Sequence, residues 1–326
     1  MLKARTMINM DSEDEGVATV SCAGGLRVQF TKEIQRTTVQ GSLLTLKVEG
    51  LLGGHSGQDI DKERQNADLL MARMIQRLLK ETKGQLVSFN GGTKDNAIPR
   101  ECEASLIYES DEEAAKAEEL ACELAETYAE ELTPAEPDFS CEISCETNRT
   151  AEAIPQDAAK EFICAMRLAP NGIQKRNIKM DGFVVVSLNL GVVRTEEDRI
   201  VMIFSPRSSV ASLQEDTKER LNTLAETFGF TVSHSSEYPG WSFKEDSPVR
   251  EICKESYKEL FGEDLKIEAI HAGLECGLFS DAIKGLDAIA IGPTIANCHT
   301  SDEYLTLDSF ERFYEFLKDI LSRLAK

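Results

Sequence analysis

The order of strand-like and helix-like patterns along the chain is the feature that most limits its fold. Apolar and polar residues alternate over 44–48, as on a half-buried strand, whereas apolar residues over 71–78 repeat at helical spacing. Stretches of the two kinds alternate to the end of the chain. This order favours an α/β or α+β architecture over a helical bundle or an all-β sandwich.

The first half of the chain shows the order strand, helix, strand, strand, helix, strand, which is that of a ferredoxin-like unit. A partial second copy is predicted to follow, beginning with a helix over 156–168. We therefore expect two pseudo-repeats, at about 30–146 and 147–238. The turn residues of Tyr238-Pro-Gly-Trp241 separate them from a last region, 239–326.

Charge excludes two classes of partner. The 326 residues include 36 Lys and Arg against 57 Asp and Glu, a net charge of −21. A phosphate backbone or an anionic membrane surface would be repelled by this charge, so we expect no nucleic-acid and no membrane partner. Residues 1–16 lack the apolar core of a secretory signal, and no apolar run is long enough to span a membrane. These features predict a cytoplasmic protein.

Nine cysteines make an odd number and show no repeated spacing. Cys141 and Cys145 are the only two that lie close together, and a single C-x3-C without a neighbouring histidine is weak evidence for zinc. We expect all nine to be reduced thiols, most of them small core residues.

Two residues near opposite ends of the chain have the chemistry of metal ligands. His299 lies in a polar loop with Asp302 and Glu303 close behind, an arrangement that suits a metal ligand oriented by carboxylates. Asp11 follows a short apolar strand, a common position for a metal ligand. From spacing alone, a loop histidine that bonds the backbone and a solvated aspartate remain open alternatives.

Two glycine-rich turns carry polar side chains. His55 lies in Gly53-Gly-His-Ser-Gly57, where the glycines leave the imidazole at a loop tip. Asn96 ends a second polar turn, 90–96, from which its amide could reach a site, although asparagine also serves turn geometry. Neither turn matches a nucleotide-binding pattern, so a nucleotide cradle is disfavoured.

Two further residues are candidates for binding an anion. Arg207 ends a predicted strand and could clamp a substrate carboxylate, although an exposed arginine without a ligand is the commoner case. His271 follows a strand and precedes a helix N-terminus, which favours anions. The sequence has no Gly-x-Ser-x-Gly elbow and no cysteine–histidine pattern typical of a cysteine nucleophile. Metal-assisted hydrolysis fits these polar residues best.

Taken together, the motifs resemble those of the aminoacylhistidine (Xaa-His) dipeptidases, a branch of the dinuclear-zinc aminopeptidase and carboxypeptidase superfamily. They occur in the family's order along the whole chain. The matching segments are Asn9-Met-Asp-Ser-Glu13, Gly53-Gly-His-Ser-Gly57, Asn90-Gly-Gly-Thr93 with Asn96-Ala-Ile-Pro99, Ser187-Leu-Asn-Leu-Gly191, Tyr238-Pro-Gly-Trp241, His271-Ala-Gly-Leu-Glu-Cys-Gly277 and Gly292-Pro-Thr294 with His299.

The resemblance implies an α/β catalytic domain, residues 1–25 and 239–326, interrupted by a large α+β lid at 26–238. It further implies that Asp11 and His299 each bind a different ion of a zinc pair. In this family pattern His55 polarises the scissile carbonyl from the lid. The resemblance assigns binding of the dipeptide substrate to Asn96, Arg207 and Gly273.

The family's remaining zinc ligands and its general base lie upstream of the segment that contains Asp11. The ten residues before Asp11 contain no His, Asp or Glu. We therefore expect a C-terminal portion of a zinc dipeptidase, inactive as this chain. The alternatives are a non-catalytic binding or assembly remnant, and a related metallohydrolase acting on tripeptides or N-acyl amino acids. A homodimer is a further possibility.

Overall fold

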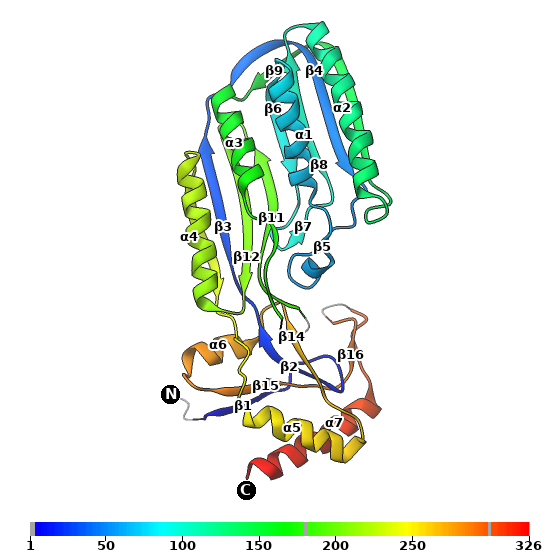
Figure 1. Ribbon diagram of the computed structural model, residues 1–326, viewed down its shortest axis with the longest axis vertical. Helices are drawn as coiled ribbons and strands as arrows, with labels where there is room; N and C mark the ends of the chain where they lie inside the picture. The colour runs from blue at the N-terminus through cyan, green and yellow to red at the C-terminus, as the bar shows by residue number, and fades with distance from the viewer. Residues whose placement is uncertain (1–3, 179–181, 299–300, 326) are drawn as a thin grey trace.

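The computed structural model describes residues 4–178, 182–298 and 301–325. They form two large β-sheets of nine and four strands, each with its own helices, and two short two-stranded ladders, β5-β7 and β16-β17, the latter pairing Ile295–Ala296 with Tyr304–Leu305 (Figure 1). In the view of Figure 1 the nine-stranded sheet lies above the four-stranded one. No described helix is long and apolar enough to cross a membrane.

The larger sheet is built from the middle of the chain. Its order is β13-β3-β12-β11-β6-β8-β4-β9, with β10 paired to β11. The pairs that join these strands are antiparallel. The strands are β3 (Gly24–Glu33), β4 (Thr37–Glu49), β6 (Gln85–Gly91), β8 (Cys102–Tyr108), β9 (Ser140–Ala153), β10 (Gly172–Asn177), β11 (Phe183–Thr195), β12 (Arg199–Ser208) and β13 (Thr231–Tyr238).

Two ferredoxin-like units make up this sheet. The first is β4-α1-β6-β8-α2-β9, with α1 (Ala67–Glu81) and α2 (Asp111–Leu132). The second is β3-α3-β11-β12-α4-β13, with α3 (Gln156–Leu168) and α4 (Ala211–Thr227). In both, the strand order is fourth, first, third, second. The first unit is thus inserted after the first strand of the second, so the units are interleaved in sequence rather than consecutive as the pattern predicted.

One hydrophobic core holds both units together. The four helices bury apolar side chains against one face of the sheet, in a single cluster that extends from Leu26 to Phe230. The aromatic rings of Phe89 and Phe162 meet edge to face within it, with centroids 5.4 Å apart. In Figure 1 the four helices α1 to α4 lie side by side on the same face of the nine-stranded sheet, so helices and sheet form two packed layers.

The smaller sheet is built from the two ends of the chain. Its order is β1-β15-β2-β14, and α5 and α7 pack on it through a second apolar cluster. A third cluster joins α6 to the sheet. The elements are β1 (Thr6–Asn9), β2 (Val17–Cys22), α5 (Pro248–Phe261), β14 (Lys266–Ile270), α6 (Glu275–Ala282), β15 (Asp287–Ala290) and α7 (Leu307–Leu324).

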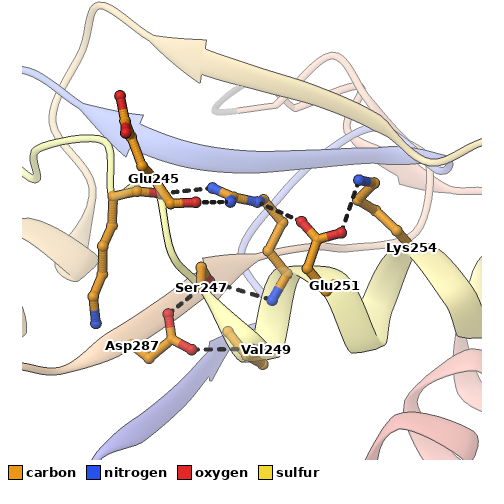
Figure 2. A network of polar contacts seen from close by, with 8 residues as sticks. Glu245, Ser247, Val249, Glu251, Lys254 and Asp287 are labelled. Atoms are coloured by element: carbon orange, nitrogen blue, oxygen red, sulfur yellow. Dashed lines mark hydrogen bonds and ion pairs between the residues drawn. The ribbon is translucent and has the colours of Figure 1, made fainter.

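A buried aspartate anchors the start of α5 to the smaller sheet (Figure 2). Asp287, on β15, accepts hydrogen bonds from the Ser247 hydroxyl at 2.6 Å and the Val249 backbone N–H at 2.9 Å. Ser247 caps the helix by accepting from the Arg250 N–H, and the Arg250 guanidinium donates to the Glu245 carbonyl. The bonds to Asp287 and Ser247 give the Val249 and Arg250 backbone N–H groups, which have no partner within the helix, an acceptor each.

The chain passes between the two sheets at two points that lie side by side. Cys22, at the end of β2, exchanges two backbone hydrogen bonds of 3.0 and 2.9 Å with Trp241, just after β13. A side chain on Gly24 would collide with the backbone at Gly240, so the crossing segments can approach this closely only with glycine there. The crossing brings the ends of β12 and β13 beside the residues that follow β14.

Candidate functional site

The side chains at this junction come from both sheets. Arg207 lies near the end of β12, Tyr238 ends β13 and Ser187 lies on β11, all in the larger sheet. His271 follows β14 of the smaller sheet, and His55 lies on β5 (Gly54–His55), a short strand paired with β7 (Ala97–Ile98).

The loop around His55 fixes the imidazole in one tautomer. The backbone N–H groups of Gly57 and Gln58 both donate to Nδ1, at 3.2 and 2.9 Å. The His55 N–H donates in turn to the Asp59 carboxylate at 2.8 Å, and Lys62 pairs with the same carboxylate. Because Nδ1 accepts, the proton of the neutral ring is on Nε2. Nε2–H is thereby available to donate to a ligand.

Burial, followed by the positive charge of Arg207, lowers the pKa of His55 below its usual 6.5, against a smaller opposite effect of Asp59. The ring is therefore neutral at neutral pH. A neutral imidazole with its proton on Nε2 is suited to donating a hydrogen bond to a carbonyl oxygen that gains negative charge.

Arg207 is buried, with 7% of its surface exposed, although exposure is the commoner state of an arginine at a strand end. Its Nη1 donates to the Tyr238 hydroxyl at 2.9 Å, while Nε is buried without a hydrogen-bond partner among the described residues. Nε and Nη2 share the edge of the guanidinium that binds carboxylates side-on. Among the described residues, Nε therefore keeps a hydrogen bond that it does not donate.

His271 is buried and connects the two large sheets by a hydrogen bond. Its Nε2 lies 2.7 Å from the Ser187 hydroxyl, a contact between residues 84 apart in sequence. Burial first, then the charge of Arg207, lowers the pKa of His271 to about 3, so the ring is neutral. The sequence marked His271 as part of a family motif and as a residue that precedes a helix, and it gave no sign of the contact with Ser187.

Gly57 lies close to three residues of the site, His55, Arg207 and His271. A side chain there would collide with the His271 carbonyl oxygen, and its Cβ would lie 3.1 Å from Cε1 of His55 and 3.3 Å from Nε of Arg207. His55 and Arg207, 152 positions apart in sequence, therefore both lie against Gly57. Gly57 and His271 also line a cavity of about 770 Å³ that reaches β14, large enough for a small ligand.

The other predicted site residues are Asn96, Gly273, Asp11 and His299. Asn96 is exposed and immediately precedes Ala97, the partner of His55 in the β5–β7 ladder. Gly273 packs against the ring of Tyr238, where a Cβ would come within 2.9 Å of Cε2. Asp11 is exposed after β1, where its backbone N–H donates to Asn9 Oδ1, and among the described residues no hydrogen bond joins it to His55 or Arg207. His299 lies outside the described residues.

The described residues do not form a complete metal site. No group of three or more His, Cys, Asp or Glu side chains among them could hold a metal ion. All nine cysteines are free thiols, as expected, but only four are fully buried and Cys122 is exposed. Cys141 and Cys145 are both half-buried on β9.

The chain matches a known family of peptidases. Residues 83–323 match the family described as "Peptidase family M20/M25/M40", and the chain belongs to this family. The match confirms the resemblance predicted from the motifs.

The chain is similar to the cytosol non-specific dipeptidase of Escherichia coli (strain K12), with 32% identity over 329 residues, 99% of this chain and 67% of that protein. It is also similar to the crystal structure of aminoacylhistidine dipeptidase from Vibrio alginolyticus, with 33% identity and a TM-score of 0.94 over 99% of this chain and 66% of that one. The α/β fold is thereby confirmed. The chain spans about two thirds of the length of these relatives.

Proposed function

We propose that the chain forms the substrate-binding and carbonyl-polarising part of a dipeptidase that cleaves Xaa-His dipeptides. The main support is the closeness of His55 to Arg207, which both flank Gly57. Successive Cα atoms in a peptide are about 3.8 Å apart. His55 and Arg207 are close enough for one to contact the scissile carbonyl and the other the terminal carboxylate of a substrate in which a single residue separates these two groups. A dipeptide has that spacing, whereas a tripeptide cut at its first bond has one residue more.

In this proposal the two ends of the C-terminal residue are held by different elements. Nε2–H of His55 donates to the scissile carbonyl oxygen, and the bond strengthens as negative charge develops there. The Nε and Nη2 edge of Arg207 binds the terminal carboxylate in bidentate fashion. Asn96, beside His55, and Gly273, beside Tyr238, are proposed to contact the dipeptide on either side.

For the metal, we propose a zinc pair to which Asp11 and His299 each contribute one ligand. The family is metal-dependent, which supports this assignment. The described residues bring no three ligands together, so we assign to them only the binding and polarisation of the substrate. We accordingly propose that this 326-residue chain binds dipeptides without hydrolysing them.

Calorimetric titration tests the binding proposal with three probes: an Xaa-His dipeptide, the same dipeptide amidated at its C-terminus, and a tripeptide. We expect the dipeptide to bind at least tenfold more tightly than the amide, because a charge-assisted carboxylate bond is lost. Arg207→Lys should remove this preference, while Arg149→Lys, an exposed control on β9, should keep it. Equal affinities for dipeptide and amide would contradict the proposal.

A second experiment tests the metal assignment. Zinc content is measured after dialysis, and amino acid release from an Xaa-His dipeptide is followed with added zinc. We expect fewer than two tightly bound ions per chain and no release. Two bound ions with turnover would show that the chain is a complete enzyme.

The cellular setting follows from the same relatives and from charge. The similar Escherichia coli protein is named for the cytosol, and we propose the same compartment for this chain. The net charge of −21 supports the absence of a nucleic-acid partner. A homodimer stays a prediction, which light scattering would test.

A further inference from the structure

Tyr238 occupies a slot that only glycine neighbours permit. A Cβ on Gly25 would lie 2.7 Å from the Tyr238 hydroxyl oxygen, and one on Gly273 would lie 2.9 Å from ring atom Cε2. Contacts this short are repulsive, so both positions leave room for the ring by lacking a side chain. The ring is therefore held from two sides, and its hydroxyl has a fixed position.

That fixed hydroxyl is the hydrogen-bond partner of Arg207. Nη1 of Arg207 donates to it at 2.9 Å, across 31 positions of sequence. A long arginine side chain has many rotamers, and holding it in one of them has an entropic cost. The bond to the Tyr238 hydroxyl selects the rotamer in which Nη1 faces Tyr238 and Nε lies beside Gly57.

The Nε atom of the same guanidinium is a hydrogen-bond donor that is buried without an acceptor in the part of the chain that the structure describes. Nε is buried and has no hydrogen-bond partner among the described residues. A buried donor on a permanently charged group is costly to leave unpaired, and a carboxylate relieves that cost. The group is thus oriented before the ligand arrives, which reduces the ordering that binding requires.

We propose that Tyr238 is a positioning residue, which turns Arg207 so that its Nε and Nη2 edge receives the terminal carboxylate of the substrate. The inference rests on the proposed function, because the ligand it invokes is the dipeptide. Tyr238 itself touches Arg207 rather than the substrate. Its effect is therefore on the selectivity for a free carboxylate and not on affinity in general.

The test is Tyr238→Phe, which removes the hydroxyl and keeps the ring in its slot. Titration of the variant and the wild type with an Xaa-His dipeptide and its C-terminal amide gives the ratio of the two Kd values. We expect the preference for the dipeptide to fall about fivefold, the worth of one hydrogen bond, with the Kd of the amide unchanged. Tyr314→Phe, at an exposed tyrosine of α7, is the matched control and should leave the ratio intact.

A second variant tests the same inference without removing the hydroxyl. Gly25→Ala should displace the phenol and lower the same ratio, because its Cβ would lie against the hydroxyl oxygen. If the wild type prefers the dipeptide and both variants keep that preference, the role of Tyr238 is refuted and the proposed function stands. If the wild type shows no preference, both proposals fail.

Discussion

Replacing Asp68 by asparagine should stabilise the protein, and by an amount that increases with pH. Asp68 lies in the first turn of α1, fully buried, and a side chain on the neighbouring Gly91 would collide with its carboxylate. Burial raises the pKa of Asp68 to about 8, against smaller opposing effects of the Cys102 thiol and of Arg194. The folded protein therefore keeps this acid protonated up to about pH 8.

The magnitude follows from linkage between protonation and folding. In the unfolded chain the same carboxyl ionises near pH 4, so between about pH 4 and pH 8 the folded state binds one more proton. Stability is then lost as pH rises, by about 1.4 kcal/mol per pH unit, or on the order of 4 kcal/mol between pH 4 and pH 7. Asparagine has the shape of the protonated acid and does not ionise, so Asp68→Asn escapes this loss.

Urea unfolding followed by circular dichroism at pH 4.5, 6.0 and 7.5 measures the effect. The difference in unfolding free energy between Asp68→Asn and wild type should increase at each step, since other titrating groups cancel in the comparison. Asp157→Asn, at an exposed aspartate in the first turn of α3, is the matched control. A difference that stays constant with pH, or that turns against the variant as pH rises, would refute the reasoning.

Three further predictions concern the junction between the sheets and its surroundings. Gly57→Ala should raise the Kd for an Xaa-His dipeptide at least tenfold, because its side chain would collide with the His271 carbonyl; titration showing wild-type affinity would contradict this. His271 should stay neutral down to about pH 4 in a nitrogen-15 NMR titration, and protonation above pH 5 would count against its burial beside Arg207. Asp287→Ala should lower the unfolding free energy by about 2 kcal/mol, because the Ser247 hydroxyl and the Val249 N–H lose their partner; an unchanged urea midpoint would argue against this anchor.

Many of the helices and strands can be predicted from the sequence because the patterns that indicate them are local. The helix expected over 156–168 agrees with α3, and the alternation over 44–48 marks part of β4. The interleaving of the two units was not predictable in this way. It depends on β3 pairing with β12 and β13, about 170 and 200 positions away, and the periodicity of a strand carries no information about its partner.

The site shows the same division between local and long-range information. The glycine-rich turn drew attention to His55 because glycine and a polar tip residue are neighbours in sequence. The burial of Arg207 and its bond to Tyr238 were missed, since both arise where β12 and β13 end beside the crossing at Trp241. Tyr238 and Ser187 each stood in a segment that resembles the family, but the sequence gave neither residue a role.

The central claim is that His55 and Arg207 hold the two ends of one amino acid residue. Nitrogen-15 NMR detects the two groups directly, through His55 Nε2–H and Arg207 Nε–H, during titration with an Xaa-His dipeptide. We expect both signals to shift along binding curves with the same Kd, and the amidated dipeptide to leave the Arg207 signal in place at equal concentration. Saturable binding of the dipeptide with neither signal shifted would contradict the claim.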